Sequence, residues 1–283
     1  MAITSLPAAL MQRPFGNSCK NIVMLLTAVL LLCCPRPVGS ASFSSFYYFN
    51  PDSTQSNLTR LKETMDAALT SGGLTCAFQP FVRLRDFEAK IVDDPPDFLF
   101  LPEWYLRQDG NLKKRFKPFL VPVRQGTSTY RKVLLVAADS DLTMEKLPGV
   151  TIAMTPMGQA GLAMLNEAIF AAHGLTYDKL TFVTTAKDSD ALFALALRQV
   201  KAALVSMDNL TYIGRINPQI PKTVKTLAVS QPVPLPVLCY AQGIVSAEEV
   251  EKLKSLLLAG RQNENVAKIM EMLQIDAWQV YPH

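Results

Sequence analysis

Short apolar segments alternate with segments of helical periodicity along most of the chain. Residues 46–49 read FYYF, and apolar side chains then recur every three or four residues over 58–69, as they do on one face of a helix. The same change recurs from 150–154 to 162–173 and from 180–183 to 189–200. Strands that alternate with helices in this way form βαβ units. The alternation predicts an α/β fold whose mostly parallel sheets are flanked by helices.

The expected elements follow from this alternation. Strands are expected at 46–49, 76–81, 97–101, 119–123, 132–137, 150–154, 180–183, 202–206, 226–230 and 236–240. Helices are expected at 58–69, 87–92, 162–173, 189–200, 247–259 and 264–273, the first with Ser53 as its cap. Ligands of parallel sheets bind outside the carboxyl ends of the strands. The segments after residues 49, 80, 101, 154, 183 and 206 are therefore the places to look for a site.

Length and charge narrow the class of protein. The chain has 283 residues, enough for two lobes of about 100–150 residues each. It carries 28 Lys and Arg against 24 Asp and Glu, and residues 1–41 hold three of the basic residues and none of the acidic ones. The remainder is nearly neutral, which excludes a polybasic nucleic-acid binder. With 49% hydrophobic and 18% charged residues, a largely disordered chain is also excluded.

The first 41 residues are typical of a signal peptide. Residues 21–34 read NIVMLLTAVLLLCC, an uncharged run shorter than the about 20 residues that cross a bilayer. Arg13 and Lys20 precede this run, and the small residues of 38–41 follow it. We predict cleavage near Ala41 and export to the periplasm. An uncleaved membrane anchor is one alternative, and a lipoprotein is another because two cysteines end the apolar run.

The remaining cysteines and the histidines bear on redox state and catalysis. Cys76 and Cys239 lie outside the leader, and they either pair or remain two buried thiols. His173 and His283 are the only histidines, and the chain has neither a CxxC nor a G-x-S-x-G motif. A zinc site or a His-based catalytic triad therefore lacks its components. We expect no metal, no cofactor and no enzymatic activity.

Several segments together resemble a known family. Pro118–Val123 is followed by Gly126 and Tyr130, and LPGVTIA at 147–153 is similar to the family pattern L-x-G-x-x-I-A. Gly161 near a helix start and the stretch 232–234 complete the order. The chain resembles periplasmic substrate-binding proteins of the phosphonate/phosphite/phosphate ABC-transporter type over about residues 46–260. The resemblance implies the two-lobed type II periplasmic-binding-protein fold.

The resemblance also implies an organisation and a role. Lobe 1 would comprise residues 42–125 and 231–283, lobe 2 would comprise 126–230, and two crossover strands would form the hinge. The protein would be a monomer that captures a small anionic ligand, phosphonate-like or phosphate-like, in the cleft between the lobes and passes it to an ABC transporter permease. A carboxylate or a sulfonate is an alternative ligand. A second role on the same fold is a ligand-sensing accessory protein for a membrane receptor or kinase.

The segment 155–161 is the main candidate for an anion site. It ends a strand and begins a helix, where free N–H groups and the helix dipole favour a negative ligand. A plain βα turn is the alternative, as a simple N-cap is for Ser53. Asp208, which follows a strand, could accept a ligand amine or could be a solvated loop acid. The full set of candidate ligand-binding residues is Ser53, Thr54, Tyr105, Tyr130, Thr155, Gly158, Gln159, Ala160, Gly161 and Asp208.

The candidate site also departs from the family pattern. Phosphonate binders of the family tend to carry Ser-x-Ser-Gly, and this chain reads GQAG at 158–161, without the two hydroxyls. Where the family often places a histidine, at the start of the next helix, this chain has Asp188 and Asp190 nearby. Two carboxylates there would disfavour a doubly charged phosphate. The departures leave the identity of the ligand open.

Overall fold

A computed structural model describes residues 44–55 and 57–282. The predicted signal peptide, residues 1–41, lies outside the described residues. Among the helices of the described part, none has both the length and the apolar composition needed to cross a membrane.

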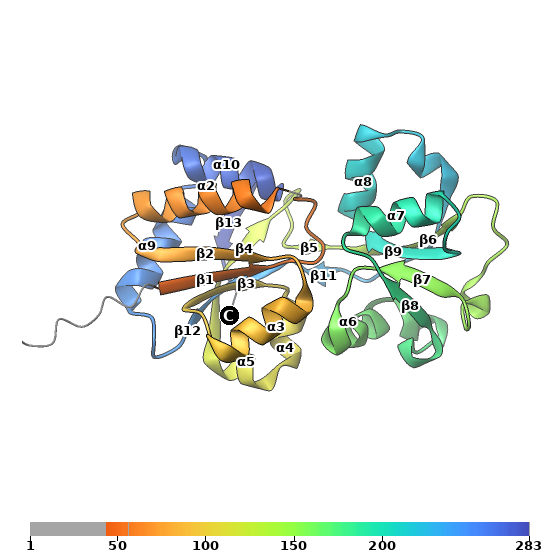
Figure 1. The fold of residues 1–283 in the computed structure, drawn as a ribbon, viewed down its shortest axis with the longest axis horizontal. Helices are drawn as coiled ribbons and strands as arrows, with labels where there is room; N and C mark the ends of the chain where they lie inside the picture. Colours follow the sequence, from red (N-terminus) through yellow and green to blue (C-terminus); the bar gives the residue numbers. More distant parts are fainter. Residues whose placement is uncertain (1–43, 56, 283) are drawn as a thin grey trace, which may run out of the picture. The chain divides into compact units, whose positions relative to one another are not determined.

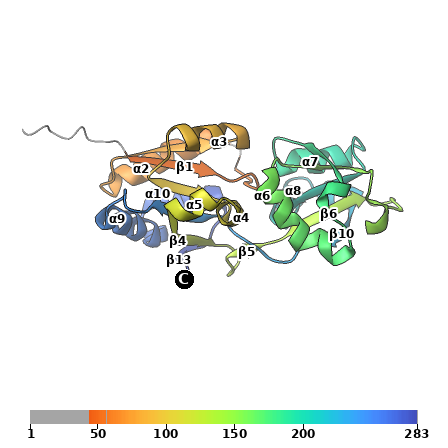
Figure 2. The same cartoon turned by 90° about the horizontal axis from the view of Figure 1, so that it is seen from below.

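The first sheet has six strands in the order β13-β4-β12-β3-β1-β2 (Figure 1). Its strands are β1 (Ser44–Phe49), β2 (Cys76–Phe81), β3 (Phe98–Leu101), β4 (Phe116–Val123), β12 (Val237–Ala241) and β13 (Ala277–Val280). One face packs on α2 (Leu58–Ser71), α9 (Ala247–Leu258) and α10 (Glu264–Leu273). The other packs on α3 (Leu84–Asp93), α4 (Glu103–Gln108) and α5 (Gly110–Arg115), as Figure 2 shows from below. Helices therefore cover both faces.

The second sheet has five strands in the order β10-β6-β9-β7-β8. Its strands are β6 (Lys132–Ala137), β7 (Thr151–Met154), β8 (Thr181–Thr184), β9 (Ala202–Ser206) and β10 (Val224–Val229). Its α-helices are α6 (Gly158–Leu165), α7 (Asp188–Ala196) and α8 (Met207–Ile216). Short helical turns are η1 (Met144–Lys146), η2 (Asn166–Phe170), η3 (Ala171–His173), η4 (Tyr177–Lys179), η5 (Ile220–Thr223) and, beside α10, η6 (Gly260–Gln262).

A two-stranded ribbon joins the sheets. Strands β5 (Thr129–Tyr130) and β11 (Val233–Pro234) pair antiparallel, one on each of the two chain segments that run between the sheets. This arrangement confirms the predicted α/β fold with two crossovers. The lobe boundaries proposed at 125/126 and 230/231 stay a prediction, because a hinge is defined by motion.

The two sheets are mixed, where mostly parallel sheets were expected. Strand β1 pairs parallel with β2 and β3, and β7 pairs parallel with β8 and β9. Strand β12 is antiparallel to both of its neighbours, and so is β6. Each of these strands brings the chain into its sheet from the other sheet. Each therefore runs antiparallel to its neighbouring strands, which lead toward the other sheet.

The apolar segments form strands that are buried on both faces. In β1, Phe46 and Tyr48 contact the α2 side while Tyr47 and Phe49 contact the α3 side, and all four are at most 2% exposed. The rings pack edge-to-face or stacked, as Phe49 does on Phe87 at a centroid distance of 4.9 Å. Such strands read as continuous apolar runs because successive side chains point to opposite faces, both of them covered.

Helix starts differ from expectation at two places. Asn57, not Ser53, caps α2, and its side chain accepts from the Arg60 N–H at 2.9 Å. Helix α6 begins at Gly158, four residues before the predicted start, and the helix over 166–173 continues as a π-turn and a 3₁₀-turn. The glycines of 158–161 therefore belong to the first turn of the helix, where a loop was expected.

Several elements were not predicted: helices α4, α5 and α8, strand β13, the short strands β5 and β11, and the turns η4, η5 and η6. Helices α4 and α5 have six residues each and β13 has four, too short to display a period. Helix α8 begins directly after β9, and Ser206 caps it by accepting from the Asn209 N–H at 3.2 Å. The remaining expected elements are present, with boundaries shifted by a few residues.

The two cysteines within the described residues are free thiols. Cys76 lies on β2 and Cys239 on β12, and strands β3 and β1 separate them in the sheet. Three inter-strand steps amount to about 14 Å, whereas disulfide-bonded Cα atoms lie within about 7 Å. Burial raises the pKa of the Cys76 thiol to about 12 and also raises that of Cys239.

Candidate functional site

A buried cluster of charges lies where strands of both sheets end. Lys132 Nζ lies 2.5 Å from Asp52 Oδ1 and 3.5 Å from Asp188 Oδ1. The Tyr130 hydroxyl donates to Asp52 Oδ2 at 2.6 Å. Asp52 follows β1 of the first sheet, whereas Lys132 begins β6 of the second. The cluster therefore connects the two sheets.

Local structure fixes two members of the cluster. Lys132 is fully buried, and its backbone N–H donates to the Ser230 hydroxyl at 2.9 Å. Asp188 is the first residue of α7, and its carboxylate accepts the Ser206 N–H at 2.6 Å. A carboxylate in the first turn of a helix is favoured by the helix dipole. Both side chains are thus anchored within the second sheet and its helices.

Burial and mutual attraction set the protonation of the cluster. Burial by itself would lower the pKa of Lys132, but Asp188 and Asp52 outweigh it and raise that pKa, so the ammonium stays charged. Burial, together with the negative charge of Asp52, raises the pKa of Asp188. Burial and Asp52 likewise raise the pKa of Tyr130, which stays a hydrogen-bond donor. One cation is shared by two carboxylates.

A cavity of about 420 Å³ lies directly beside the cluster. Its lining includes Pro51 and Ser53, which flank Asp52, and Lys187, which precedes Asp188. The Ser53 hydroxyl accepts from the Tyr48 hydroxyl at 3.2 Å and from the Gln55 N–H at 3.1 Å. The first residues of α2 also line the cavity. The predicted site residue Ser53 is thus part of a cavity wall that both sheets supply.

A second cavity, of about 550 Å³, lies at the amino end of α6. Thr155, Gly158 and Gln159 line it from the second sheet, and Leu84, Arg85 and Glu88 of α3 line it from the first. No side chain caps α6, so the N–H groups of its first turn have no partner within the helix. The Thr155 hydroxyl is fully buried and has no hydrogen-bond partner. Free donors of two kinds thus meet at this cavity.

Two tyrosines bond to residues that line the same cavity. The Tyr105 hydroxyl donates to Glu88 at 3.0 Å, and the Tyr177 hydroxyl donates to Gln159 Oε1 at 3.4 Å. The indole N–H of Trp104 is buried without a partner. A Cβ placed on Gly158 would lie 3.0 Å from Leu84 Cδ2, and Gly158 has a φ of +61°. Glycine at this position lets α3 approach the start of α6 closely.

Six predicted residues line neither of these two cavities. Tyr130 belongs to the charge cluster, Tyr105 bonds to the lining residue Glu88, Asp208 lies at another cavity, and the others are Thr54, Ala160 and Gly161. Gly161 is buried against Met157 and Trp104, and a Cβ there would lie 2.2 Å from the Met157 Cβ. The absence of a side chain at Gly161 allows this close packing. The sequence had predicted that it lets a ligand approach the backbone. Ala160 packs on the same core, and the described contacts of Thr54 include no partner that links it to the cluster.

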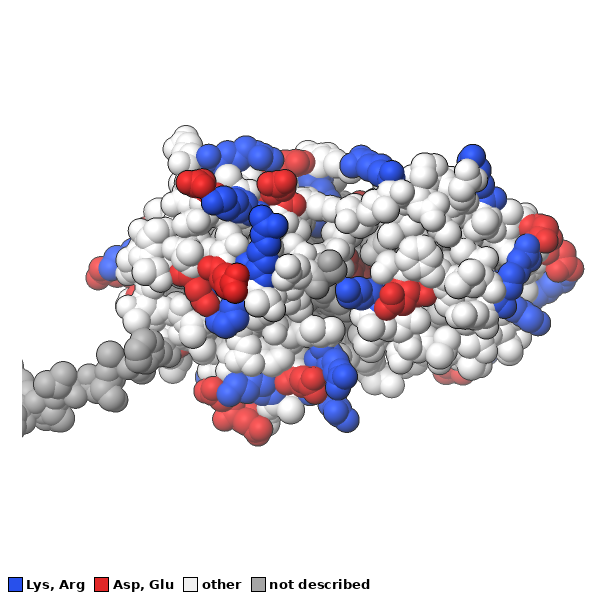
Figure 3. All heavy atoms as spheres, turned by 45° about the horizontal axis from the view of Figure 1, so that its top comes forward, with Lys and Arg blue, Asp and Glu red and all other residues white. Residues whose placement is uncertain are grey.

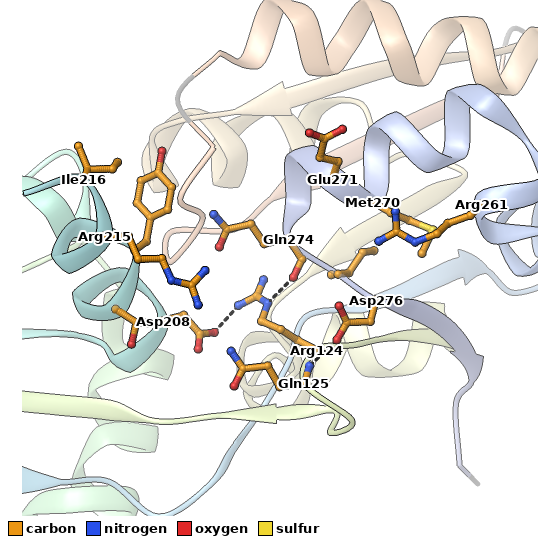
Figure 4. A pocket seen from close by; sticks show the side chains of 13 residues that line it. Arg124, Gln125, Asp208, Arg215, Ile216, Arg261, Met270, Glu271, Gln274 and Asp276 are labelled. Atoms are coloured by element: carbon orange, nitrogen blue, oxygen red, sulfur yellow. Dashed lines mark hydrogen bonds and ion pairs between the residues drawn. The ribbon is translucent and has the colours of Figure 1, made fainter.

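Asp208 lies in the first turn of α8, at a third cavity of about 480 Å³ (Figure 4). Its carboxylate pairs with the Arg124 guanidinium, which also donates to the carbonyls of Leu273 at 3.0 Å and Gln274 at 2.9 Å. Figure 4 shows Arg124 between α8 and the end of α10. Asp208 therefore forms a second ion pair between an element of the first sheet and a helix of the second. The sequence had predicted either a solvated loop acid or a contact to a ligand amine.

Sequence reasoning missed the central cation of the cluster. Lys132 heads the segment KVLLVA, and a charged residue at the start of an otherwise apolar buried strand was the available signal. Asp52 follows the first predicted strand and is not among the candidate residues. Its pairing with a residue 80 positions later cannot be seen in the chain order.

Charges on the outer surface are mixed. Figure 3 shows basic and acidic side chains interspersed over the face that it presents. Within the described residues, no group of three or more His, Cys, Asp and Glu side chains is placed to hold a metal ion.

Two sheets joined by two crossovers, with buried polar groups where their strand ends meet, define the class of two-lobed periplasmic binding proteins. The chain belongs to the family described as "ABC transporter, phosphonate, periplasmic substrate-binding protein", whose model matches residues 43–281. Members of this family are substrate-binding components of a transporter and not enzymes.

Solved structures share the fold. A binding-protein component of an ABC phosphonate transporter from Pseudomonas aeruginosa is 16% identical with a TM-score of 0.67, over 84% of this chain and 81% of that one. PhnD1 from Prochlorococcus marinus, in complex with methylphosphonate, is 12% identical with a TM-score of 0.65, over 84% and 92%. A histidine kinase sensor domain is 17% identical with a TM-score of 0.52, over 83% and 96%. No curated protein sequence matches this chain.

Proposed function

We propose that this protein captures a small phosphonate-like or phosphate-like anion between its two sheets, in the periplasm, and delivers it as a monomer to an ABC importer. Family membership supports the transport role. The observation that carries the anion is the buried, unpartnered Thr155 hydroxyl beside the uncapped start of α6.

The start of α6 offers donors that the protein itself does not use. The N–H groups of residues 158–160 have no partner within the helix, and the helix dipole adds partial positive charge there. A buried hydroxyl without a partner costs about 1–3 kcal/mol. An oxyanion in the cavity would accept from Thr155 and from these N–H groups together, which offsets that cost. Helix starts of this kind are established anion sites.

Isothermal titration calorimetry with methylphosphonate, phosphate, a sulfonate and a carboxylate tests the proposal. We expect at least one of these anions to bind the wild-type protein. Thr155→Val keeps the shape of the side chain and removes the hydroxyl, so we expect the affinity to fall about tenfold or more. Thr151→Val, at the opposite end of β7, serves as the matched control. Binding by none of the anions would contradict the proposal, and equal affinity of the Thr155→Val and Thr151→Val variants would exclude Thr155 from the site.

A further inference from the structure

The Asp52 carboxylate is bound as a ligand oxyanion would be bound. One oxygen lies 2.5 Å from the buried ammonium of Lys132, and the other accepts from the Tyr130 hydroxyl at 2.6 Å. Both donors belong to segments other than the one that carries Asp52. A charge-assisted contact from an ammonium together with a phenol hydroxyl is a complete seat for two oxygens of one anion.

Within this seat, Asp52 is the member that can leave. Lys132 and Asp188 are fully buried and anchored in regular structure, and they are 3.5 Å apart. Asp52 lies in a turn after β1, where its N–H donates to the Asn50 side chain at 3.1 Å. Its side chain is 8% exposed. The neighbouring 420 Å³ cavity offers space on its own side of the cluster.

The charges allow such an exchange. With Asp52 in place, the Lys132 ammonium has two carboxyl partners, Asp52 and Asp188. With Asp52 displaced, Lys132 and Asp188 balance each other, and one donor direction of the ammonium is free. An incoming anion would then restore the arrangement that Asp52 provides. An anion that enters while Asp52 stays would meet a carboxylate in the same seat.

We propose that Asp52 is an internal anion that competes with the ligand for the seat formed by Lys132 and Tyr130. Ligand binding exchanges the Asp52 carboxylate for the ligand oxyanion, and the occupancy of the seat by Asp52 lowers the apparent affinity. The inference rests on the proposed function because it takes the ligand to be an anion. It adds a second anion contact, apart from the start of α6, and a residue that sets the affinity.

Replacement of Asp52 tests the competition. Asp52→Asn keeps the size of the side chain but removes its charge, and Lys132 keeps Asp188 as its partner. We expect methylphosphonate or phosphate to bind Asp52→Asn at least about tenfold more tightly than wild type, because the apparent affinity scales with the fraction of free seats. Asp139→Asn, which breaks a surface ion pair with Arg198, should bind as the wild type does.

The outcomes separate this inference from the proposed function. Wild-type binding with equal or weaker binding by Asp52→Asn overturns the competition and leaves the function intact; weaker binding would make Asp52 a ligand contact. Binding by neither protein overturns both. Binding by Asp52→Asn alone supports the competition.

Asp208→Asn breaks the other ion pair between the sheets. An equal gain in affinity there would attribute the effect to loosened sheets and overturn the competition. Thermal unfolding checks that each variant folds, and Asp52→Ser replaces Asp52→Asn if the latter does not.

Discussion

At the scale of single residues, Lys132 is the least expected feature of the chain. A lysine is almost never fully buried unless it is paired. Lys132 meets that condition through Asp52 and Asp188, which come from segments 80 and 56 residues away. Lys132 therefore has its two carboxylate partners only in the folded state. There its pair with Asp52 connects the two sheets.

We predict that Lys132→Met lowers the free energy of unfolding by about 3–5 kcal/mol, because it leaves two buried carboxylates without their cation. Urea unfolding followed by circular dichroism measures this change. Lys62→Met is the matched control, because it removes a surface pair with Asp66 that is 46% and 37% exposed. Such a pair contributes at most about 1 kcal/mol. Equal losses in the two variants would contradict the structural role of Lys132.

Asp188 gives the protein a specific dependence of stability on pH. Its pKa is raised in the folded state, mainly by burial. Its contribution to stability is therefore complete below its pKa in the unfolded chain, about 3.9, and is lost as the pH rises through its raised pKa in the folded protein. Asp188→Asn does not titrate, so we predict a flatter curve of unfolding free energy as the pH rises above about 4. Parallel curves for wild type and variant would show that Asp188 has no raised pKa.

At the scale of elements, helix starts position the candidate site. Helix α6 begins with Gly158 in the left-handed region and without a capping side chain, whereas α2, α8 and α9 are capped by Asn57, Ser206 and Ser246. The capped helices satisfy their first N–H groups internally. Helices α3, α4 and α7 also lack a capping side chain, and α6 differs from them in the two glycines of its first turn and in the unpartnered Thr155 hydroxyl beside it.

We predict that Gly158→Ala lowers the free energy of unfolding by about 1–2 kcal/mol, because alanine is strained at a φ of +61°. The added methyl would also lie 3.0 Å from Leu84. Gly110 is the matched control, because it is also the first residue of a helix, and a Cβ there meets nothing within 4 Å. Gly110→Ala should leave stability unchanged or raise it slightly. Chemical unfolding of both variants distinguishes backbone strain from a general effect of alanine.

At the scale of the whole molecule, two ion pairs connect elements of the two sheets. Asp52 with Lys132 is buried, and Asp208 with Arg124 is partly exposed. The chain thus supplies its own contacts between the elements of its two sheets. On the proposed function, the two sheets would move apart to exchange the ligand, and both pairs would have to separate for that motion.

The predicted signal peptide also belongs to this scale. We predict that the protein exported from a Gram-negative host begins near Ser42, because small residues at 38–41 favour cleavage there and β1 begins at Ser44. Intact-mass spectrometry of the exported protein measures its first residue. A lipid-modified start at Cys33 or Cys34 would establish the lipoprotein alternative, and retention of all 283 residues would establish an anchor.

Local pattern determined most of the fold. Most buried strands and amphipathic helices were predictable, because burial on two faces or on one leaves a direct trace in the order of apolar residues. Helix α8, with ten residues, was not predicted. Short helices such as α4 and α5 left no such trace. The order of strand, glycine-containing turn and helix at the start of α6 was also predictable, because it is a local arrangement.

Only the tertiary structure decided which polar groups meet. The carboxylate of Asp52, the ammonium of Lys132 and the carboxylate of Asp188 come together through strand order and two crossovers, which local sequence does not encode. The same holds for Gly161, whose role depends on Met157 and Trp104 packed against it. Periodicity records which side of an element is buried, but the partner on that side is set by the packing of the whole chain.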